Sequence, residues 1–337
     1  MNPVPSPAAV ARQKGRSREH GLPRKTGLSR ERGLPRETGL SGGNGVPLLL
    51  ALLLFAGASC APAGTLAVQD GPPEQEIPRV GPPNGTLLVA GGGTLGPEIW
   101  GRFVELAGGP EGRLVVIPTA GNDDYFPPDW PGLQALRDAG ARHVTVLHTR
   151  DRDKANSDEF VQAIREATGV WFPGGRQWRL VDAYLDTRVH EELFALLERG
   201  GVVGGTSAGA SIQASFLVRG DPATNEILVS PEYQEGFGFL NHTAVDQHLL
   251  ARNRQDDLWE LLDLHPDLLG IGLDEGAAIV VTGDRAEVIG TSRVVIYDAS
   301  GPLRESRYLR PGEVVDLARR TTSILAPDDM DGEAGHF

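Results

Sequence analysis

Short apolar runs alternate with amphipathic stretches along the chain from residue 86 onward. Nearly continuous apolar runs predict strands that are buried on both faces, whereas apolar residues spaced three and four apart predict helices. The predicted strands are 86–93, 113–121, 143–149, 169–175 and 201–209, and the predicted helices are 97–108, 132–140, 158–168 and 189–200. Strands that alternate with helices form a parallel sheet, so we expect a doubly wound, mostly parallel α/β fold with helices on both faces.

The pattern changes between residues 268 and 298, where apolar strands are separated by short turns such as Thr282-Gly283-Asp284. Turns this short leave no room for crossover helices, so these strands are predicted to be antiparallel. We expect them to extend one edge of the sheet, within a single domain that spans residues 85–318. The residues that follow, 319–337, predict an acidic tail.

The first 60 residues differ in composition from the rest of the chain. A twelve-residue unit rich in Gly, Pro and charge occurs at 18–29 and again at 30–41, and such a stretch cannot bury enough apolar surface to fold. The apolar run within 46–63 is too short to span a bilayer but matches the core of a signal peptide. We therefore expect an exported protein, periplasmic, extracellular or tethered to a membrane, with residues 61–84 as a Pro/Gly-rich tether.

Cys60 is the only cysteine in the chain and lies where a signal peptide would be cut. The small residues before it resemble a bacterial lipoprotein cleavage site, although Gly57 stands where such sites usually carry leucine. Lipidation of Cys60 is one interpretation, and the others are ordinary cleavage near Ala58 or Ala63 or an incidental cysteine. In each case no disulfide can form within the chain.

Charge distinguishes the leader from the remainder. The formal net charge is −13, but residues 1–45 contain nine Lys and Arg against three acidic residues, which leaves 23 basic and 42 acidic residues elsewhere. A strongly acidic domain repels nucleic acid and anionic lipid, so neither is expected as a partner. The only membrane association we expect is through lipid on Cys60, and the sequence leaves open whether the chain forms a homodimer.

The stretch "GVVGGTSAGASI" at 201–212 contains the pattern G-x-S-x-G, with Ser207 at its centre. It follows an apolar strand and precedes a helix of small residues, which is the context of a nucleophile elbow. Such a turn strains the backbone of the serine, and only small neighbours let strand and helix approach closely enough. The start of the helix also offers free N–H groups to a developing oxyanion. The alternative is a glycine-rich turn that only packs against a neighbour.

A catalytic serine needs a base, and the base needs an acid to orient it. Among the eight histidines, His242 and His248 are the candidates, because the others lie in plain strand and helix patterns or near the chain ends. His248 follows a short strand at what we expect to be a carboxyl edge of the sheet, where sites of α/β proteins lie. Glu275 is the candidate for the orienting acid and Asp274 competes with it, since both follow an apolar strand. The alternatives are a solvated loop histidine and a carboxylate that only belongs to a turn.

Four segments taken together resemble peptidase family S51, which contains the cyanophycinases and aspartyl dipeptidases. The segments are "FPGGRQ", "GGTSAGA", "DQHLLARNR" and "GLDEGAA", within a resemblance that covers residues 86–316. The order Ser, His, Glu is similar to that of the cyanophycinase branch. The resemblance implies a fold like that of class I glutamine amidotransferases, and a serine peptidase that cleaves beside aspartate through an acyl-enzyme.

The resemblance also implies roles for individual residues. Ser207 resembles the nucleophile, His248 the general base and acid, and Glu275 the residue that orients the base. The N–H groups of an oxyanion hole would come from Gly174, Gly175 and Ala208. The residues that match substrate-binding positions of cyanophycinases are Gln177, Asp246, Gln247, Arg252 and Arg254.

Cyanophycin has a poly-aspartate backbone with arginine on each side-chain carboxyl. An enzyme pocket that binds it must therefore offer both cationic and anionic side chains. Arg252 and Arg254 could hold carboxylates, and Asp246 could pair with a guanidinium. This chain departs from the family pattern at Asp257, where cyanophycinases usually carry arginine, and at Arg176, which replaces an acidic or neutral residue. These changes invert charge near the pocket, so an exopeptidase for short aspartyl peptides is the alternative to a cyanophycinase.

Two other classes follow from the residues alone. "GGGTLG" at 91–96 fits the G-x-G-x-x-G pattern of a dinucleotide site, but the next strand ends in Pro-Thr-Ala-Gly and lacks the acid that would bind the ribose. The second class is a membrane-tethered protein that keeps the elbow but only binds peptides. No H-E-x-x-H motif or close His/Asp cluster occurs, so we expect neither a cofactor nor a metal.

Overall fold

The computed structural model describes residues 77–228 and 231–324, which lie within one compact unit. The expected N-terminal repeat and the signal peptide with Cys60 lie outside the described residues, as do most of the predicted tether and the acidic tail beyond 324. In the part of the chain that the structure describes, no helix is long and apolar enough to cross a membrane.

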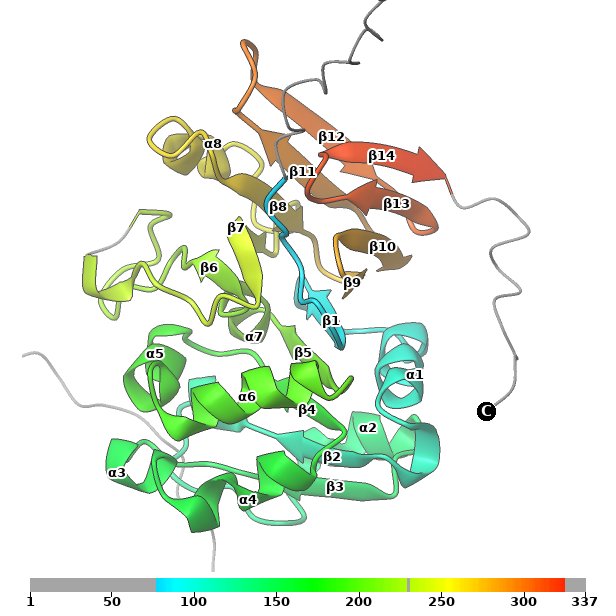
Figure 1. The fold of residues 1–337 in the computed structure, drawn as a ribbon, viewed down its shortest axis with the longest axis vertical. Helices are drawn as coiled ribbons and strands as arrows, with labels where there is room; N and C mark the ends of the chain where they lie inside the picture. Colours follow the sequence, from blue (N-terminus) through cyan, green and yellow to red (C-terminus); the bar gives the residue numbers. More distant parts are fainter. Residues whose placement is uncertain (1–76, 229–230, 325–337) are drawn as a thin grey trace, which may run out of the picture. The chain divides into compact units, whose positions relative to one another are not determined.

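The described residues form a nine-stranded sheet in the order β14-β13-β10-β9-β1-β5-β4-β2-β3 (Figure 1). Its parallel strands are β1 (Thr86–Ala90), β2 (Arg113–Val116), β3 (His143–Val146), β4 (Gly169–Phe172) and β5 (Val202–Thr206). Its antiparallel strands are β9 (Ala277–Thr282), β10 (Arg285–Gly290), β13 (Glu313–Asp316) and β14 (Thr321–Ile324). The central strands β1, β4 and β5 are buried over most or all of their length, because helices cover both of their faces.

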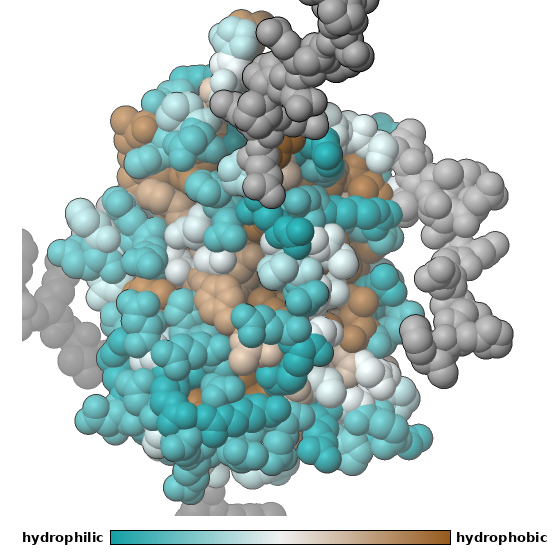
Figure 2. Space-filling model, viewed as in Figure 1, coloured by the Kyte–Doolittle hydropathy of each residue, from teal (hydrophilic) through white to brown (hydrophobic). Residues whose placement is uncertain are grey.

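Helices pack on both faces of this sheet. One face carries α1 (Pro97–Leu106) and α2 (Gln134–Asp138). The opposite face carries α3 (Arg152–Ala155), α4 (Asp158–Glu166), α5 (Trp178–Tyr184), α6 (Arg188–Glu198) and α7 (Ala208–Ser211). In α4, Phe160, Val161 and Ile164 are buried while the charged residues face outward, and the surface over α4 and α6 is mostly hydrophilic in Figure 2.

A second sheet of the described residues has the order β12-β11-β8-β7-β6. Its strands are β6 (Ala214–Phe216), β7 (Leu240–Gln247), β8 (Leu269–Leu273), β11 (Val294–Asp298) and β12 (Glu305–Leu309). Strands β6, β7 and β8 are parallel to one another, and α8 (Asp257–Leu262) buries its leucines against β11. Short 3-10 helices occupy Gly109–Glu111, Pro118–Ala120, Pro131–Leu133 and Pro231–Tyr233.

The predicted doubly wound sheet is confirmed, with helices on both faces, parallel strands from β1 to the β3 edge and antiparallel strands from β9 to the other edge. The prediction of one antiparallel extension was incomplete, because β9 and β10 extend the main sheet whereas β8 and β11 belong to the second one. A short turn shows only that two strands follow each other closely along the chain. It does not reveal whether the two strands join the same sheet.

The packed part of the chain extends beyond the expected limits of 85 and 318. Val80 is buried, and the backbone N–H groups of Val80 and Gly81 donate to the carboxylate of Asp284. On the other side, β14 pairs with β13 beyond residue 318.

Candidate active site

Ser207 lies between β5 and α7, at the carboxyl end of a central strand of the main sheet. Its backbone has φ of 56° and ψ of −114°, outside the regions that non-glycine residues favour. A Cβ on Gly205 would lie 2.2 Å from the carbonyl oxygen of Gly209, and a Cβ on Gly209 would lie 2.0 Å from that of Phe172. Both glycines of G-x-S-x-G are therefore required for the strand, the strained turn and the helix to pack this closely.

His248 and Glu275 reach Ser207 from the second sheet. Strands β7 and β8 are parallel with Gln247 opposite Leu273, so the residues that follow the two strands lie at the same edge. The Oγ of Ser207 is 2.9 Å from Nε2 of His248, and Nδ1 of His248 is 2.5 Å from Oε1 of Glu275. The structure thus brings the candidate nucleophile, base and orienting acid into one chain of hydrogen bonds.

The end of β1 holds the three segments of this site together. Three successive carbonyl oxygens accept hydrogen bonds from one backbone N–H group in each segment. The bonds run from Ser207 to Ala90 at 3.0 Å, from His248 to Gly91 at 2.9 Å and from Gly276 to Gly92 at 3.1 Å. A single strand end therefore positions the elbow of the main sheet relative to the two residues of the second sheet.

The glycines of "GGGTLG" have a packing role at this site. A Cβ on Gly92 would lie 2.3 Å from Cε1 of His248, and a Cβ on Gly93 would lie 2.6 Å from Oε2 of Glu275. Both glycines have positive φ, 119° and 66° respectively. The loop backbone lies directly against the imidazole and the carboxylate, an approach that only glycine permits. Sequence reasoning noticed the pattern but missed this contact, because it joins residues far apart in the chain.

Asp274, the competing candidate for the orienting acid, has a different position. Its Oδ1 accepts hydrogen bonds from the N–H groups of Leu250 and Ala251, both at 2.9 Å, and its Oδ2 accepts one from the hydroxyl of Ser292 at 2.6 Å. Burial raises the pKa of Asp274, but these hydrogen bonds outweigh burial and hold the pKa below its ordinary value. Asp274 therefore anchors the turn after the histidine, whereas Glu275 contacts the imidazole.

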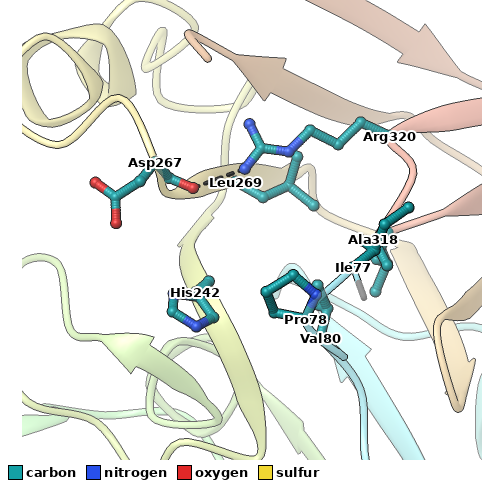
Figure 3. A pocket seen from close by; sticks show the side chains of 9 residues that line it. Ile77, Pro78, Val80, His242, Asp267, Leu269, Ala318 and Arg320 are labelled. Carbon is teal, nitrogen blue, oxygen red and sulfur yellow. Dashed lines mark hydrogen bonds between the residues drawn. The ribbon is translucent and has the colours of Figure 1, made fainter. Parts of the chain in front are cut away.

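His242, the other candidate base, lies at the opposite end of β7. There it lines a pocket with Pro78, Val80 and Arg320 (Figure 3). Six positions along a strand separate it from His248, a distance of about 20 Å, so His242 does not reach Ser207. Among the described residues, no group of three or more His, Cys, Asp or Glu lies close enough together to hold a metal ion.

The residues expected to form the oxyanion hole lie near the Ser207 hydroxyl. A Cβ on Gly174 would be 3.6 Å from Oγ of Ser207. Gly175 has φ of 147°, and a Cβ there would lie 2.1 Å from the carbonyl oxygen of Ala120. Ala208 is the first residue of α7, so its N–H group has no partner within the helix. The 174–175 turn and the start of α7 thus both adjoin the candidate nucleophile.

Most residues expected to bind substrate are buried and hydrogen-bonded within the protein. The Nε2 of Gln177 donates to the carbonyl oxygen of Val218 at 2.9 Å. The Nη1 of Arg254 donates to Oε1 of Gln247 at 3.2 Å and to its carbonyl oxygen at 2.9 Å. Of the five expected substrate ligands, all of which are described, Arg252 alone is exposed to solvent.

Asp246 forms a buried ion pair that sequence reasoning missed. Its side chain is fully buried, and Arg219 donates to both carboxylate oxygens, with Nε to Oδ1 and Nη2 to Oδ2 each at 2.8 Å. The same guanidinium donates to Oδ2 of Asp257 at 2.5 Å and to the carbonyl oxygen of Asn225 at 2.7 Å. The charge of Asp257 is therefore balanced by Arg219, which comes from a loop with no recognisable motif.

Comparison with known proteins places the chain in a family. A model of peptidase family S51 matches residues 87–289, more than half of the chain. The chain belongs to peptidase family S51. The resemblance seen in the four sequence segments is confirmed, and the fold is shared with a solved peptidase from an acI-B1 Actinobacterium. That structure has a TM-score of 0.55 and 25% identity, and the match covers 71% of this chain and 97% of the other.

Named relatives of this S51 peptidase are similar over about half to two thirds of the chain. Cyanophycinases of Geminocystis herdmanii and Synechococcus elongatus are 33% and 32% identical over 221 and 226 residues. These matches cover 63% and 64% of this chain, and 80% and 68% of the relatives. A probable alpha-aspartyl dipeptidase of Drosophila melanogaster is 27% identical over 171 residues, which cover 48% of this chain and 67% of the relative.

The surroundings of His248 in this S51 peptidase favour the neutral imidazole. Burial lowers the pKa of His248 below its ordinary value, and the positive charges of Arg252 and Arg254 lower it further. The hydrogen bond and the charge of Glu275 act in the opposite direction but do not cancel these effects. The imidazole can therefore accept a proton at neutral pH.

The acid limb of activity is expected to reflect this pKa. A group with a lowered pKa stays deprotonated to lower pH, so kcat/KM should hold from neutral pH down to below about pH 6.5 and then fall. Replacing Arg252 by glutamine removes a charge that lowers the pKa of His248, and should move the limb to higher pH. The measurement is kcat/KM against pH at low ionic strength. Arg113→Gln, at the amino end of β2, is the control, and an acid limb above pH 6.5 or insensitive to Arg252 would contradict the assignment.

Kinetic measurements are expected to distinguish the roles of the adjacent carboxylates of Asp274 and Glu275. Glu275→Gln should lower kcat by about 10³ to 10⁴, because an amide can neither hold the tautomer nor stabilise the imidazolium. Asp274→Asn should lower kcat less than about tenfold while lowering the free energy of unfolding by about 1–3 kcal/mol, because it removes bonds to the turn. Steady-state kinetics and urea unfolding of both variants test this difference, and the reverse ranking of kcat would assign the orienting role to Asp274.

Proposed function

We propose that this S51 peptidase is a serine peptidase that cleaves peptide bonds beside aspartate through an acyl-enzyme. The observation that carries the proposal is the chain of hydrogen bonds from Ser207 through His248 to Glu275. It begins on a strained elbow beside the 174–175 turn, where a tetrahedral intermediate could be stabilised.

Acylation begins when neutral His248 accepts the hydroxyl proton of Ser207 at Nε2. The Oγ forms a bond to the scissile carbonyl carbon, and negative charge develops on the carbonyl oxygen beside the N–H groups of the 174–175 turn and of Ala208. Glu275 stabilises the imidazolium through Nδ1. His248 then donates its proton to the leaving amine, the C–N bond breaks, and an ester remains on Ser207.

Deacylation repeats these steps with water as the nucleophile. His248 accepts a proton from water, the hydroxide oxygen attacks the ester carbon, and the C–O bond to Ser207 breaks. The proton returns to Oγ, which releases a carboxylic acid and restores the enzyme. Each step uses the same histidine alternately as base and acid.

The substrate class is supported by the relatives. Two are named cyanophycinases and one a probable alpha-aspartyl dipeptidase. We extend to this chain only what these names have in common, an aspartyl-containing peptide bond. Cyanophycin and β-Asp-Arg are one form of such a substrate, and a short aspartyl peptide is the other.

The proposal is tested by hydrolysis of cyanophycin, β-Asp-Arg, isoaspartyl and α-aspartyl peptides by the purified protein. Mass spectrometry of a quenched reaction should also detect the acyl group on the peptide that contains Ser207. Cleavage of the polymer would place the chain with the cyanophycinases, and cleavage of short peptides alone would indicate a dipeptidase-like enzyme. Peptide binding without hydrolysis would show a binding protein instead and refute the proposed function.

We also propose that the N-terminal segment directs export. The support is the signal-peptide pattern with Cys60 in the sequence, which lies outside the described residues. Intact mass of the mature protein from native cells distinguishes the cases, because a diacylglyceryl group on an N-terminal Cys60 adds a defined mass. A mature protein that retains residues 18–41 would contradict export through this signal.

A further inference from the structure

The acidic side chain closest in sequence to His248 is not available to a substrate cation. Asp246 is fully buried, and both of its carboxylate oxygens are bound by Arg219. Arg254 lies 3.8 Å from the same carboxylate. A substrate guanidinium would have to displace Arg219 to reach Asp246, and would leave the charge of Arg219 buried with only Asp257 as its carboxylate partner.

Two arginines that follow the 174–175 turn lack a carboxylate partner. The Nη2 of Arg176 donates to two carbonyl oxygens of the loop at 221–224, both at 2.7 Å. The Nη1 of Arg179 donates to the carbonyl oxygens of residues 120–121, at 3.0 and 2.7 Å. Within residues 77–228 and 231–324, no ion pair joins either guanidinium to an Asp or Glu carboxylate within 4.0 Å.

Both arginines follow the 174–175 turn, which is expected to supply N–H groups to the oxyanion hole. Arg176 directly follows Gly175, and its backbone N–H donates to the carbonyl oxygen of Ala120 at 2.9 Å. Arg179 binds that same carbonyl oxygen through its side chain. A Cβ on Gly174, the first glycine of this turn, would lie 3.6 Å from Oγ of Ser207, so both arginines belong to a segment that begins beside the candidate nucleophile.

The positive charges in this cluster repel one another. Burial lowers the pKa of Arg179, and the charges of Arg150 and Arg176 lower it further. Asp124 opposes this effect, but its carboxylate is paired with Arg150. Both Arg176 and Arg179 are partly buried, and each makes its side-chain hydrogen bonds through a single Nη, so other N–H donors remain. An anion would relieve this repulsion, and a carboxylate matches the planar guanidinium donors.

We infer that Arg176 and Arg179 form a subsite for the aspartate carboxylate of the substrate that is not part of the scissile bond. This inference rests on the proposed function and narrows its substrate. The peptidase selects an aspartyl peptide by its free carboxylate, and arginine on the substrate is not required. In α-linked peptides this group is the side-chain carboxylate, and in β-linked peptides it is the α-carboxylate.

The test measures kcat/KM for aspartyl-leucine, its analogue with that carboxylate as carboxamide, and aspartyl-arginine, in the linkage that the enzyme cleaves better. Loss of the carboxylate should lower kcat/KM of the wild type about tenfold to a hundredfold, mainly through KM, because a charged hydrogen bond is lost. In the Arg176→Gln and Arg179→Gln variants, replacing the substrate carboxylate by a carboxamide should lower kcat/KM much less. The values of kcat/KM for aspartyl-leucine and aspartyl-arginine should differ by less than about threefold.

Arg199→Gln is the matched control for both variants. Arg199 also donates only to carbonyl oxygens, those of Ile164 and Ala167, at the amino end of the sheet, and burial also lowers its pKa. This variant should keep the wild-type ratio of kcat/KM for the carboxylate peptide to kcat/KM for the carboxamide peptide. A purely structural role of Arg176 or Arg179 would lower activity on both peptides equally and would overturn the inference, as would a tenfold preference for arginine. A wild type that cleaves no aspartyl peptide would instead refute the proposed function itself.

Discussion

Replacement of Ser207 by alanine is expected to lower kcat for aspartyl-peptide hydrolysis about 10⁶-fold. The substitution removes only Oγ, which lies 2.9 Å from Nε2 of His248, and with it the atom that forms the acyl bond. The glycines on either side that permit the turn remain, so the fold should persist. The measurements are kcat at saturating substrate and the loss of the acyl adduct by mass spectrometry.

In α7, the short helix that follows Ser207, Ser211→Ala provides a control. Its hydroxyl is buried and has no hydrogen-bond partner among the described residues, so its removal should leave kcat near the wild-type value. If Ser207→Ala keeps more than about a hundredth of wild-type activity, well above what loss of a nucleophile allows, another group performs the attack.

Replacement of Arg219 by methionine is expected to lower the free energy of unfolding by about 3–5 kcal/mol, because it breaks a buried ion pair and leaves one charge behind. Asp246 would keep only the N–H of Gln247 at 2.9 Å and the more distant Arg254 at 3.8 Å. Addition of Asp246→Asn should recover part of the loss, since the unpaired charge then disappears. Urea unfolding of the two variants measures both effects.

Arg285→Met is the comparison for an exposed ion pair. Arg285 lies 3.8 Å from Glu287 on β10, and its loss should change the free energy of unfolding by less than about 1 kcal/mol. If Arg219→Met is no more destabilising than Arg285→Met, the ion pairs of Arg219 with Asp246 and Asp257 do not stabilise the fold around the expected substrate-binding residues.

Local pattern was enough to predict the main elements and the elbow. A strand buried on both faces needs apolar residues throughout, so β1 and β4 were evident as continuous apolar runs. The elbow was evident for a similar reason, because the close contact that requires Gly205 is made by Gly209, four residues further along. The candidate nucleophile could therefore be identified from a short stretch of sequence.

The choice of base and acid depended on strand pairing. Pairing of Gln247 with Leu273 sets the residues after β7 and β8 side by side, which selects His248 over His242. Two further details, the bonds of Asp274 to the turn and the contact of Glu275 with the imidazole, separate the adjacent carboxylates. The spacing of turns carries no information on the second sheet, so sequence reasoning expected only one.

By itself, the sequence determined the doubly wound fold, the S51 resemblance and the position of Ser207 on a strained turn, since each depends on contacts or motifs within short segments. Only the tertiary structure decided how charge is distributed around that serine. It placed Arg219 between Asp246 and Asp257, and left Arg176 without a carboxylate partner among the described residues. Electrostatic interactions act through space, so the effect of an arginine or aspartate on the site depends on the neighbours that folding brings to it.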